Sequence, residues 1–172
     1  TINALYLDAS CERILDYANG VHDIRNRLIR LIGDPEKRYQ EDPVRMLRAV
    51  RFAAKLDFDI EKHSAAPIPR LARLLHEIPS ARLFDEVLKL FLAGNAEHTF
   101  ELLLEYNLFA PLFPAAAAAL KRDPEYAGEL IRLALASTDR RIEQGKTVTP
   151  AFLFAALLWP ALPARVSELQ DK

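Results

Sequence analysis

Apolar residues repeat at intervals of three and four from residue 43 onward, and the prolines, with Gly94 and Gly145, fall between these stretches. This spacing gathers apolar side chains on one helix face, whereas proline and glycine favour helix ends. The pattern therefore predicts a mainly helical fold. We expect helices at about residues 43–56, 61–66, 69–77, 80–93, 96–106, 115–122, 125–144 and 150–159.

The first 32 residues have a different pattern. Two short β-prone runs, residues 5–7 and 14–17, flank the turn-forming segment Asp8-Ala9-Ser10-Cys11, which predicts a β-hairpin. A third run, residues 28–32, ends at Gly33-Asp34-Pro35, where glycine and proline disfavour any continuation. We place a domain boundary after Gly33.

The helix at 43–56 has a strong start signal in Asp42-Pro43, because Asp accepts from the free amides of the first turn and Pro is preorganised there. Arg45, Arg48 and Arg51 recur every third residue and are expected along one flank. A neighbouring flank carries the apolar residues Val44, Leu47, Val50 and Ala54. The apolar side would anchor the helix, and the guanidinium groups would face phosphate oxygens or base edges.

Charge and composition narrow the function classes. The net charge of −1 argues against a uniformly basic nucleic-acid binder, yet residues 25–55 hold nine basic and four acidic residues, so this segment carries +5 and the remainder −6.

The single cysteine, Cys11, forms no internal disulfide, and a reducing cytoplasm is the expected location. Residues 150–162 are short and interrupted by Pro160, so no membrane segment is expected. The start at Thr1, without a signal sequence, predicts a piece of a longer reading frame.

Asp42 and Arg45 are the leading candidates for chemistry. They lie about one helical turn apart and together offer acceptors and donors that match the edge of a nucleotide base. In the alternative interpretation Asp42 is only a helix cap, Arg45 pairs with it, and Arg48 and Arg51 are solvated. Residue spacing alone favours this alternative.

Other candidates carry weaker signals. Tyr39, beside the arginines, is a candidate to stack on a base. The basic residues Arg70, Arg73, Arg82 and Lys89 are candidates to follow an RNA backbone, although solvated helix faces are the favoured account. Asp57 and Asp59, which form the one Asp-x-Asp, are interpreted as turn residues. His22-Asp23 could suggest a metal phosphohydrolase, but the remaining histidines, His63, His76 and His98, have no matching acidic partners at ligand spacing, so we expect no metal ligand here.

Several motifs in order along the chain resemble a known family. They are Thr1-Ile2-Asn3-Ala4-Leu5, Ile29-Arg30-Leu31-Ile32-Gly33 and Glu41-Asp42-Pro43-Val44-Arg45-Met46-Leu47-Arg48-Ala49-Val50-Arg51-Phe52. This set is similar to the bacterial tRNA nucleotidyltransferase and poly(A) polymerase family. Segments 67–71, 78–84, 107–114 and 150–154 resemble its poly(A) polymerase branch, so the resemblance covers nearly the whole chain.

The resemblance implies a fold and a division of labour. Residues 1–33 would be the end of a nucleotidyltransferase palm, 34–93 the neck helices with the RNA-binding region, and 94–172 a helical body. Asp42 and Arg45 would select the nucleotide base, and Arg48 and Arg51 would contact the triphosphate. The intact enzyme would add AMP from ATP to RNA 3′ ends, using Mg²⁺ bound by carboxylates upstream of this chain.

Three further expectations follow from that resemblance. This chain holds no catalytic residue and no metal ligand, so alone it should add no nucleotide to RNA. A CCA-adding tRNA nucleotidyltransferase is the alternative within the family, and a non-enzymatic helical scaffold for a protein partner is the alternative from another class. The sequence identifies no particular protein partner.

The chain also departs from the family pattern before the neck motif. Arg27 stands where the family usually has a turn glycine, and Gly20-Val21 stands where a glycine pair is common. We therefore expect the turn beside the hairpin to be altered.

Overall fold

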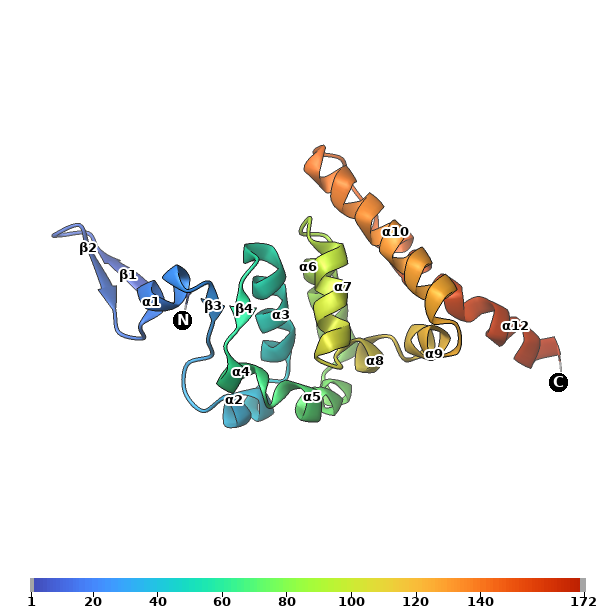
Figure 1. The fold of residues 1–172 in the computed structure, drawn as a ribbon, viewed down its shortest axis with the longest axis horizontal. Helices are drawn as coiled ribbons and strands as arrows, with labels where there is room; N and C mark the ends of the chain where they lie inside the picture. Colours follow the sequence, from blue (N-terminus) through green and yellow to red (C-terminus); the bar gives the residue numbers. More distant parts are fainter. Residues whose placement is uncertain (1, 171–172) are drawn as a thin grey trace.

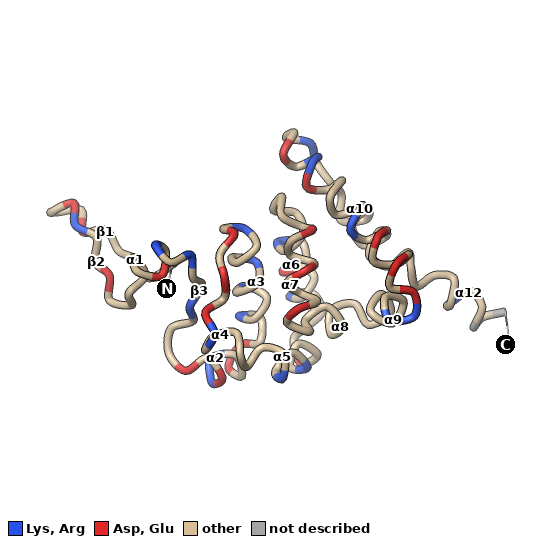
Figure 2. The backbone as a smooth tube through the Cα atoms, viewed as in Figure 1, with Lys and Arg blue, Asp and Glu red and all other residues tan. Residues whose placement is uncertain are grey.

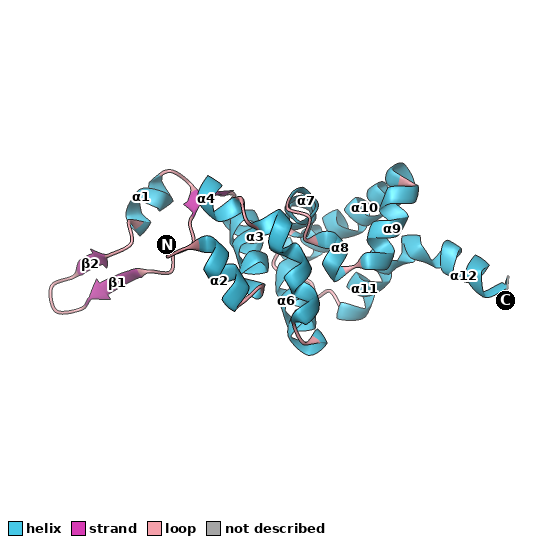
Figure 3. Cartoon of the chain, turned by 90° about the horizontal axis from the view of Figure 1, so that it is seen from below, coloured by secondary structure: helices cyan, strands magenta, loops and turns pink. Residues whose placement is uncertain are grey.

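The computed structural model describes residues 2–170 and has an elongated, mainly helical architecture, as predicted. A hairpin lies at one end, the helices stack along the long axis, and the last helix projects at the other end (Figure 1). A view from below shows the hairpin standing apart from the helices (Figure 3).

The predicted hairpin is confirmed. Strand β1 (Leu5–Asp8) pairs antiparallel with β2 (Arg13–Asp16), with Leu5 opposite Asp16. The short helix α1 (Gly20–Arg25) follows, and Asp16 accepts hydrogen bonds from the backbone amides of Gly20 at 2.8 Å and Val21 at 2.9 Å. These bonds satisfy amides at the start of α1 that have no partner within the helix.

A second, parallel pair of strands brackets the neck. Strand β3 (Leu28–Ile29) pairs with β4 (Asp59–Ile60), so the segments before and after the neck helix lie side by side across the boundary that we placed after Gly33. Asp59 donates its backbone N–H to the Arg27 carbonyl at 2.9 Å. The interpretation of Asp59 as a turn residue is therefore wrong. Asp57 does occupy a turn, with φ of 54°.

Two consecutive helices build the neck. Helix α2 (Pro35–Glu41) was missed by the hydrophobic pattern, although Asp34-Pro35 is the same start signal as Asp42-Pro43. The Asp34 carboxylate accepts from the amides of Glu36 at 3.0 Å and Lys37 at 3.4 Å. Helix α3 (Val44–Leu56) confirms the predicted neck helix, and it buries Met46, Leu47 and Val50.

The central helices enclose one apolar core. They are α4 (Lys62–Ala65), α5 (Ile68–Leu71), the 3₁₀ helix η1 (Ala72–Glu77), α6 (Ser80–Phe91), α7 (Ala96–Glu105), α8 (Phe109–Leu112) and α9 (Pro114–Arg122). Buried aromatic rings join α6, α7 and α8, with Phe100 edge-on to Phe109 at 5.0 Å and Phe91 edge-on to Phe113 at 6.3 Å. Ala116 and Ala119 are buried, so the alanine run of α9 packs against the core.

The C-terminal helices differ most from expectation. Helix α10 (Pro124–Glu143) was predicted, and α11 (Pro150–Leu158) buries only Leu153 and Leu157. Phe152 and Trp159 are about half exposed, so this apolar stretch is not fully buried. Pro160 does not end the helical stretch, because it falls in the first turn of the 3₁₀ helix η2 (Trp159–Ala161), where proline is tolerated. Helix η2 leads directly into α12 (Leu162–Gln170).

This continuation changes the sequence argument about membranes. The helical stretch Pro150–Ser167 has 18 residues and a mean hydropathy of 1.3, so by length and composition alone it could cross a bilayer. Only 17% of that stretch is buried in the structure. The expectation that this apolar run is too short is therefore wrong, although length and composition are weak evidence for a membrane span.

Candidate nucleotide-binding site

Asp42 lies at the junction of α2 and α3 and is held from two sides. Its Oδ1 accepts from the Val44 backbone amide at 3.3 Å, and its Oδ2 accepts from Arg82 Nη2, on α6, at 2.9 Å. The first bond is the local cap that the sequence suggested. The second joins residues 40 positions apart, and a fifth of the Asp42 side chain stays exposed.

The alternative interpretation expected Arg45 to pair with Asp42. Arg45 does not pair with Asp42. Its Nη1 donates to Glu41 Oε2 at 2.8 Å and to the Arg38 carbonyl at 2.7 Å. Arg38 Nη1 donates to the same Glu41 oxygen at 2.7 Å. The hydrogen bond from Arg45 is the main reason that the pKa of Glu41 is lowered. Glu41 thus positions Arg45, a role that we did not predict from the sequence.

A cavity of about 240 Å³ opens beside Arg38 and Arg45, between β3, α2, α3 and α4, and Asp42 is not among the residues that line it. Arg45, Arg48 and Phe52 line it from α3, and Arg30 and Arg38 line it from the preceding segments. Figure 2 shows Lys and Arg on either side of β3 and recurring along α3. Such a surface favours an anionic ligand. Arg30 itself is engaged by Asp23 at 3.0 Å and by Glu61 at 3.5 Å.

Tyr39 also borders the cavity but is not available for stacking. It is fully buried, its hydroxyl donates to the Ser64 carbonyl at 2.9 Å, and burial raises its pKa. The sequence-based suggestion that Tyr39 stacks on a base is therefore wrong, because its ring is inside the core.

The three arginines of α3 do not share one flank. A spacing of three residues turns about 300° around a helix, so each successive arginine falls about 60° short of the previous one. Arg48 is exposed and lacks an ion pair within residues 2–170. Arg51 instead faces α6, where its Nη1 lies 3.7 Å from Glu86 Oε2, and its guanidinium sits 5.0 Å from the Phe52 ring centre. The expectation of a single arginine flank is correct for Arg45 and Arg48 only.

The other basic candidates are mostly paired with carboxylates. Arg70 forms a two-pronged ion pair with Glu36, with both bonds at 2.6 Å, and Lys89 pairs with Glu86 at 2.8 Å. Arg73 is exposed and has no ion pair within the described part of the chain. Three of the four candidates, Arg82 included, would therefore have to exchange a carboxylate for a phosphate in order to bind RNA.

The described residues contain no group of three or more His, Cys, Asp or Glu side chains that could hold a metal ion. Asp57 is instead engaged by Arg27, which donates to its carboxylate and, through Nη2, to its backbone carbonyl at 2.6 Å. Arg27, at the position expected to hold a glycine, adopts φ of 55°, in the left-handed region that glycine tolerates best. Its side chain thereby connects the segment before the neck helices to the turn at Asp57 that follows α3.

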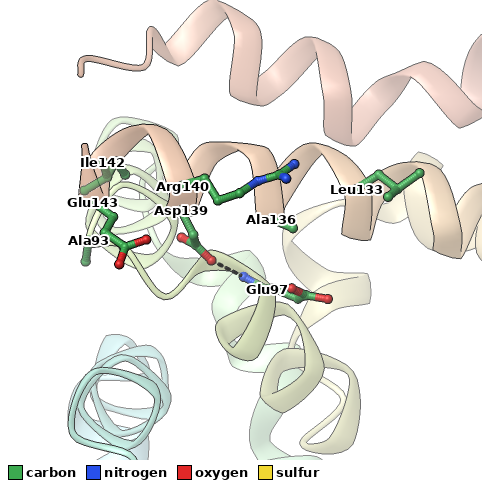
Figure 4. Close-up of a pocket in the computed structure, with 9 residues that line it drawn as sticks. Ala93, Glu97, Leu133, Ala136, Asp139, Arg140, Ile142 and Glu143 are labelled. Carbon is green, nitrogen blue, oxygen red and sulfur yellow. Dashed lines mark hydrogen bonds between the residues drawn. The ribbon is translucent and has the colours of Figure 1, made fainter. Parts of the chain in front are cut away.

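A larger hollow of about 780 Å³ lies elsewhere, between the turn at Gly94, α7 and α10. In it the Asp139 carboxylate of α10 accepts from the backbone amides of Ala96 at 2.7 Å and Glu97 at 3.1 Å (Figure 4). Asn95, the residue before α7, makes no side-chain cap, so Asp139 supplies that cap from another helix. The Asp139 carboxylate in this hollow therefore has a structural role, which is to cap α7.

Comparisons with known proteins agree with this arrangement. A family model described as "Probable RNA and SrmB- binding site of polymerase A" matches residues 57–120. Poly(A) polymerase I of Salmonella typhimurium is 52% identical over 160 residues, covering 92% of this chain and 34% of that protein. Poly(A) polymerase I of Haemophilus influenzae is 49% identical over 173 residues, covering all of this chain and 38% of that protein.

A solved structure shows the same fold. The crystal structure of the Bacillus stearothermophilus CCA-adding enzyme in complex with CTP matches with a TM-score of 0.64 and 32% identity, over 81% of this chain and 32% of that one. The architecture is therefore that of the helical part of a nucleotidyltransferase. The chain belongs to the tRNA nucleotidyltransferase and poly(A) polymerase family, and it spans about a third of the length of the curated relatives it matches.

Proposed function

We propose that the protein containing this chain is a template-independent RNA nucleotidyltransferase that adds AMP from ATP to RNA 3′ ends. Within it, this chain selects the nucleotide and supports the RNA. The observation that carries the proposal is the position of Asp42 and Arg45 at the start of α3, with Arg45 lining an arginine-rich cavity. Identity of about half of the aligned residues to Poly(A) polymerase I supports the choice of ATP.

Base selection follows from the hydrogen-bonding groups of the pair. Adenine presents an amine donor and a ring-nitrogen acceptor on its pairing edge, whereas guanine and uracil present a carbonyl acceptor and an N–H donor. Asp42 keeps acceptor capacity beyond its two hydrogen bonds, and the hydrogen bonds of Arg45 within residues 2–170 use Nη1. The Nε and Nη2 groups of Arg45 are then available to a base acceptor. The pair would accept adenine and reject guanine and uracil.

The phosphates would meet the other arginines. Arg48 is the strongest candidate, because it lines the cavity, is exposed and has no ion pair in the described part of the chain. Arg51 would first have to leave Glu86. The proposal includes Mg²⁺, which would stabilise charge on the transferring phosphate. Because the described carboxylates form no metal site, its ligands would come from outside this chain.

RNA support is proposed for the region of residues 57–120, in line with the description of the matching family model. Arg73 is the best-placed contact, since it is exposed and unpaired within residues 2–170, while Arg70 and Lys89 would exchange carboxylate partners for phosphates. We also propose a cytoplasmic location. The exposed, unpaired Cys11 is compatible with a reducing compartment.

An incorporation assay tests the proposal directly. The full-length gene product that contains this chain should extend an RNA primer with ATP and Mg²⁺, and Asp42→Ala and Arg45→Ala should each lower the rate and the preference for ATP. Unchanged rate and preference in both variants would contradict the proposed site. Addition of CTP followed by ATP to a tRNA would instead identify the CCA-adding alternative, which the likeness to the Bacillus stearothermophilus enzyme keeps open. If the protein bound neither ATP nor RNA at any salt concentration, the protein-interaction scaffold would be favoured.

A further inference from the structure

Arg82 lies on α6, outside the two helices α2 and α3, and contacts Asp42 of the proposed base-selecting pair. It lies in the first turn of α6, and its Nη2 donates to Asp42 Oδ2 at 2.9 Å. Its side chain is 49% exposed, against 20% for Asp42. We propose that Arg82 is a positioning residue that holds the Asp42 carboxylate in the orientation needed to recognise the base. This inference rests on the proposed function and adds a specificity determinant outside the neck motif.

The geometry around Asp42 leaves its carboxylate dependent on Arg82. Asp42 sits in extended backbone, with φ of −151° and ψ of 94°, between two helices, so neither helix fixes its side chain. Without Arg82, its carboxylate would retain the single bond from Val44 at 3.3 Å, near the long end of the range for hydrogen bonds. A charge-assisted bond from a guanidinium is shorter and stronger, so Arg82 supplies most of the restraint.

The helix that carries Arg82, α6, is itself held against the neck. Helix α6 reaches the neck at two points of opposite polarity, because Arg82 meets Asp42 and, one turn later, Glu86 meets Arg51. Glu86 is nearly buried. The orientation of α6 against the neck is therefore fixed by packing and by both ion pairs together. Arg82 has a firm base from which to hold Asp42.

Holding Asp42 is incompatible with the RNA contact that the sequence suggested for Arg82. A guanidinium committed to Asp42 is not free for a phosphate, and an RNA contact would release Asp42. Hydrogen-bond recognition tolerates displacements of only about 0.5 Å. Loss of Arg82 should therefore change which nucleotide is accepted rather than how tightly RNA is held.

The test uses nucleotide preference in the full-length gene product. Arg82→Gln should lower the preference for ATP over GTP about tenfold or more, since displacements near 1 Å at a reacting site can cost up to about a hundredfold. It should leave KM for RNA and its salt dependence unchanged. Arg82→Lys, which keeps the charge but loses the fork, should give an intermediate preference.

Two matched variants give the test its controls. Arg27→Gln breaks another exposed ion pair, with Asp57 in the turn after α3, and should leave nucleotide preference unchanged. Arg73→Gln removes an exposed guanidinium that has no ion pair within residues 2–170, and it should raise KM for RNA with a weaker salt dependence. Thermal unfolding of each variant establishes that the fold is retained.

The outcomes separate this inference from the proposed function. If Asp42→Asn alters nucleotide preference and Arg82→Gln does not, the positioning role is wrong while base selection by Asp42 stands. If Arg82→Gln instead behaves like Arg73→Gln, Arg82 is an RNA contact and the inference is also overturned. If Asp42→Asn has no effect, the proposed function itself fails. In the double variant, Arg82→Gln should add nothing to the preference lost with Asp42→Asn.

Discussion

Arg45 and Arg38, seven residues apart, donate to the same carboxylate oxygen, Oε2 of Glu41, at 2.8 and 2.7 Å. One anion thus orders two guanidinium groups at the edge of the cavity. The arrangement explains why Arg45 keeps a defined orientation although it does not pair with Asp42. It also leads to a prediction about protonation.

The pKa of Glu41 should depend on Arg45. Its pKa lies below the ordinary value of 4.5, and the hydrogen bond from Arg45 is the largest cause. Because the folded pKa is depressed, the stabilising contact is present above 4.5 and is lost as the pH falls through the lower folded value. Arg45→Ala should raise the pKa of Glu41 toward 4.5, and Arg38→Ala should raise it less. Carboxyl NMR titration of the chain measures both shifts, and an unchanged midpoint in Arg45→Ala would contradict the assignment.

The cap that Asp139 provides for α7 should contribute to stability. Asp139→Ala leaves the amides of Ala96 and Glu97 without their acceptor, which should lower the free energy of unfolding by about 1–2 kcal/mol. Thermal unfolding should show a fall of roughly 2–4 °C per kcal/mol for a chain of this size. Glu143→Ala, on the same helix and lining the same hollow, is the control and should change the midpoint little. Equal effects of both substitutions would show that the cap contributes nothing specific.

Tyr39 should matter for stability and not for recognition of the base. Tyr39→Phe removes the buried hydrogen bond to the Ser64 carbonyl and should lower the free energy of unfolding by about 1–2 kcal/mol. Nucleotide preference of the full-length gene product should stay the same, because the ring is enclosed in the core. Denaturant unfolding measures the first effect, and incorporation assays with ATP and GTP measure the second. A changed preference with unchanged stability would restore the stacking interpretation.

The sequence predicted the regular helices well because α3, α6, α7 and α10 combine helical periodicity with clear end signals. It missed α2, whose Asp34-Pro35 start was taken as a domain breaker, and α12, which continues beyond Pro160. Both errors have the same cause, since proline disrupts the interior of a helix but is tolerated in its first turn. The pairing of β3 with β4 could not be predicted, because two residues on each strand carry too little pattern.

The sequence suggested residues for the candidate site but not the contacts that those residues make. The motif identified Asp42 and Arg45, but it gave no indication that Arg82, 40 residues later, reaches Asp42. Such a contact depends on how α6 packs against the neck, which local periodicity does not encode. The motif did include Glu41, and its position four residues before Arg45 was a usable signal for the ion pair within the neck.

Arg27 provides a test in which two effects oppose each other. Its φ of 55° brings the steric cost of the left-handed region. Its side chain nevertheless stabilises the turn at Asp57 through hydrogen bonds to the carbonyl and the carboxylate of Asp57. Arg27→Gly removes the steric cost and the side-chain contacts together, so the free energy of unfolding should change little. Arg27→Ala keeps the steric cost and loses the contacts.

The alanine variant should therefore be less stable than the glycine variant by about 1–2 kcal/mol, the cost of a left-handed residue that has a Cβ. Denaturant unfolding of the two variants and the wild-type chain, compared at equal slope, gives the ordering. Because the Arg27–Asp57 pair is exposed on both sides, its own contribution should be at most about 1 kcal/mol. A glycine variant clearly less stable than the alanine variant would mean that the turn relaxes out of the left-handed region once the arginine is removed.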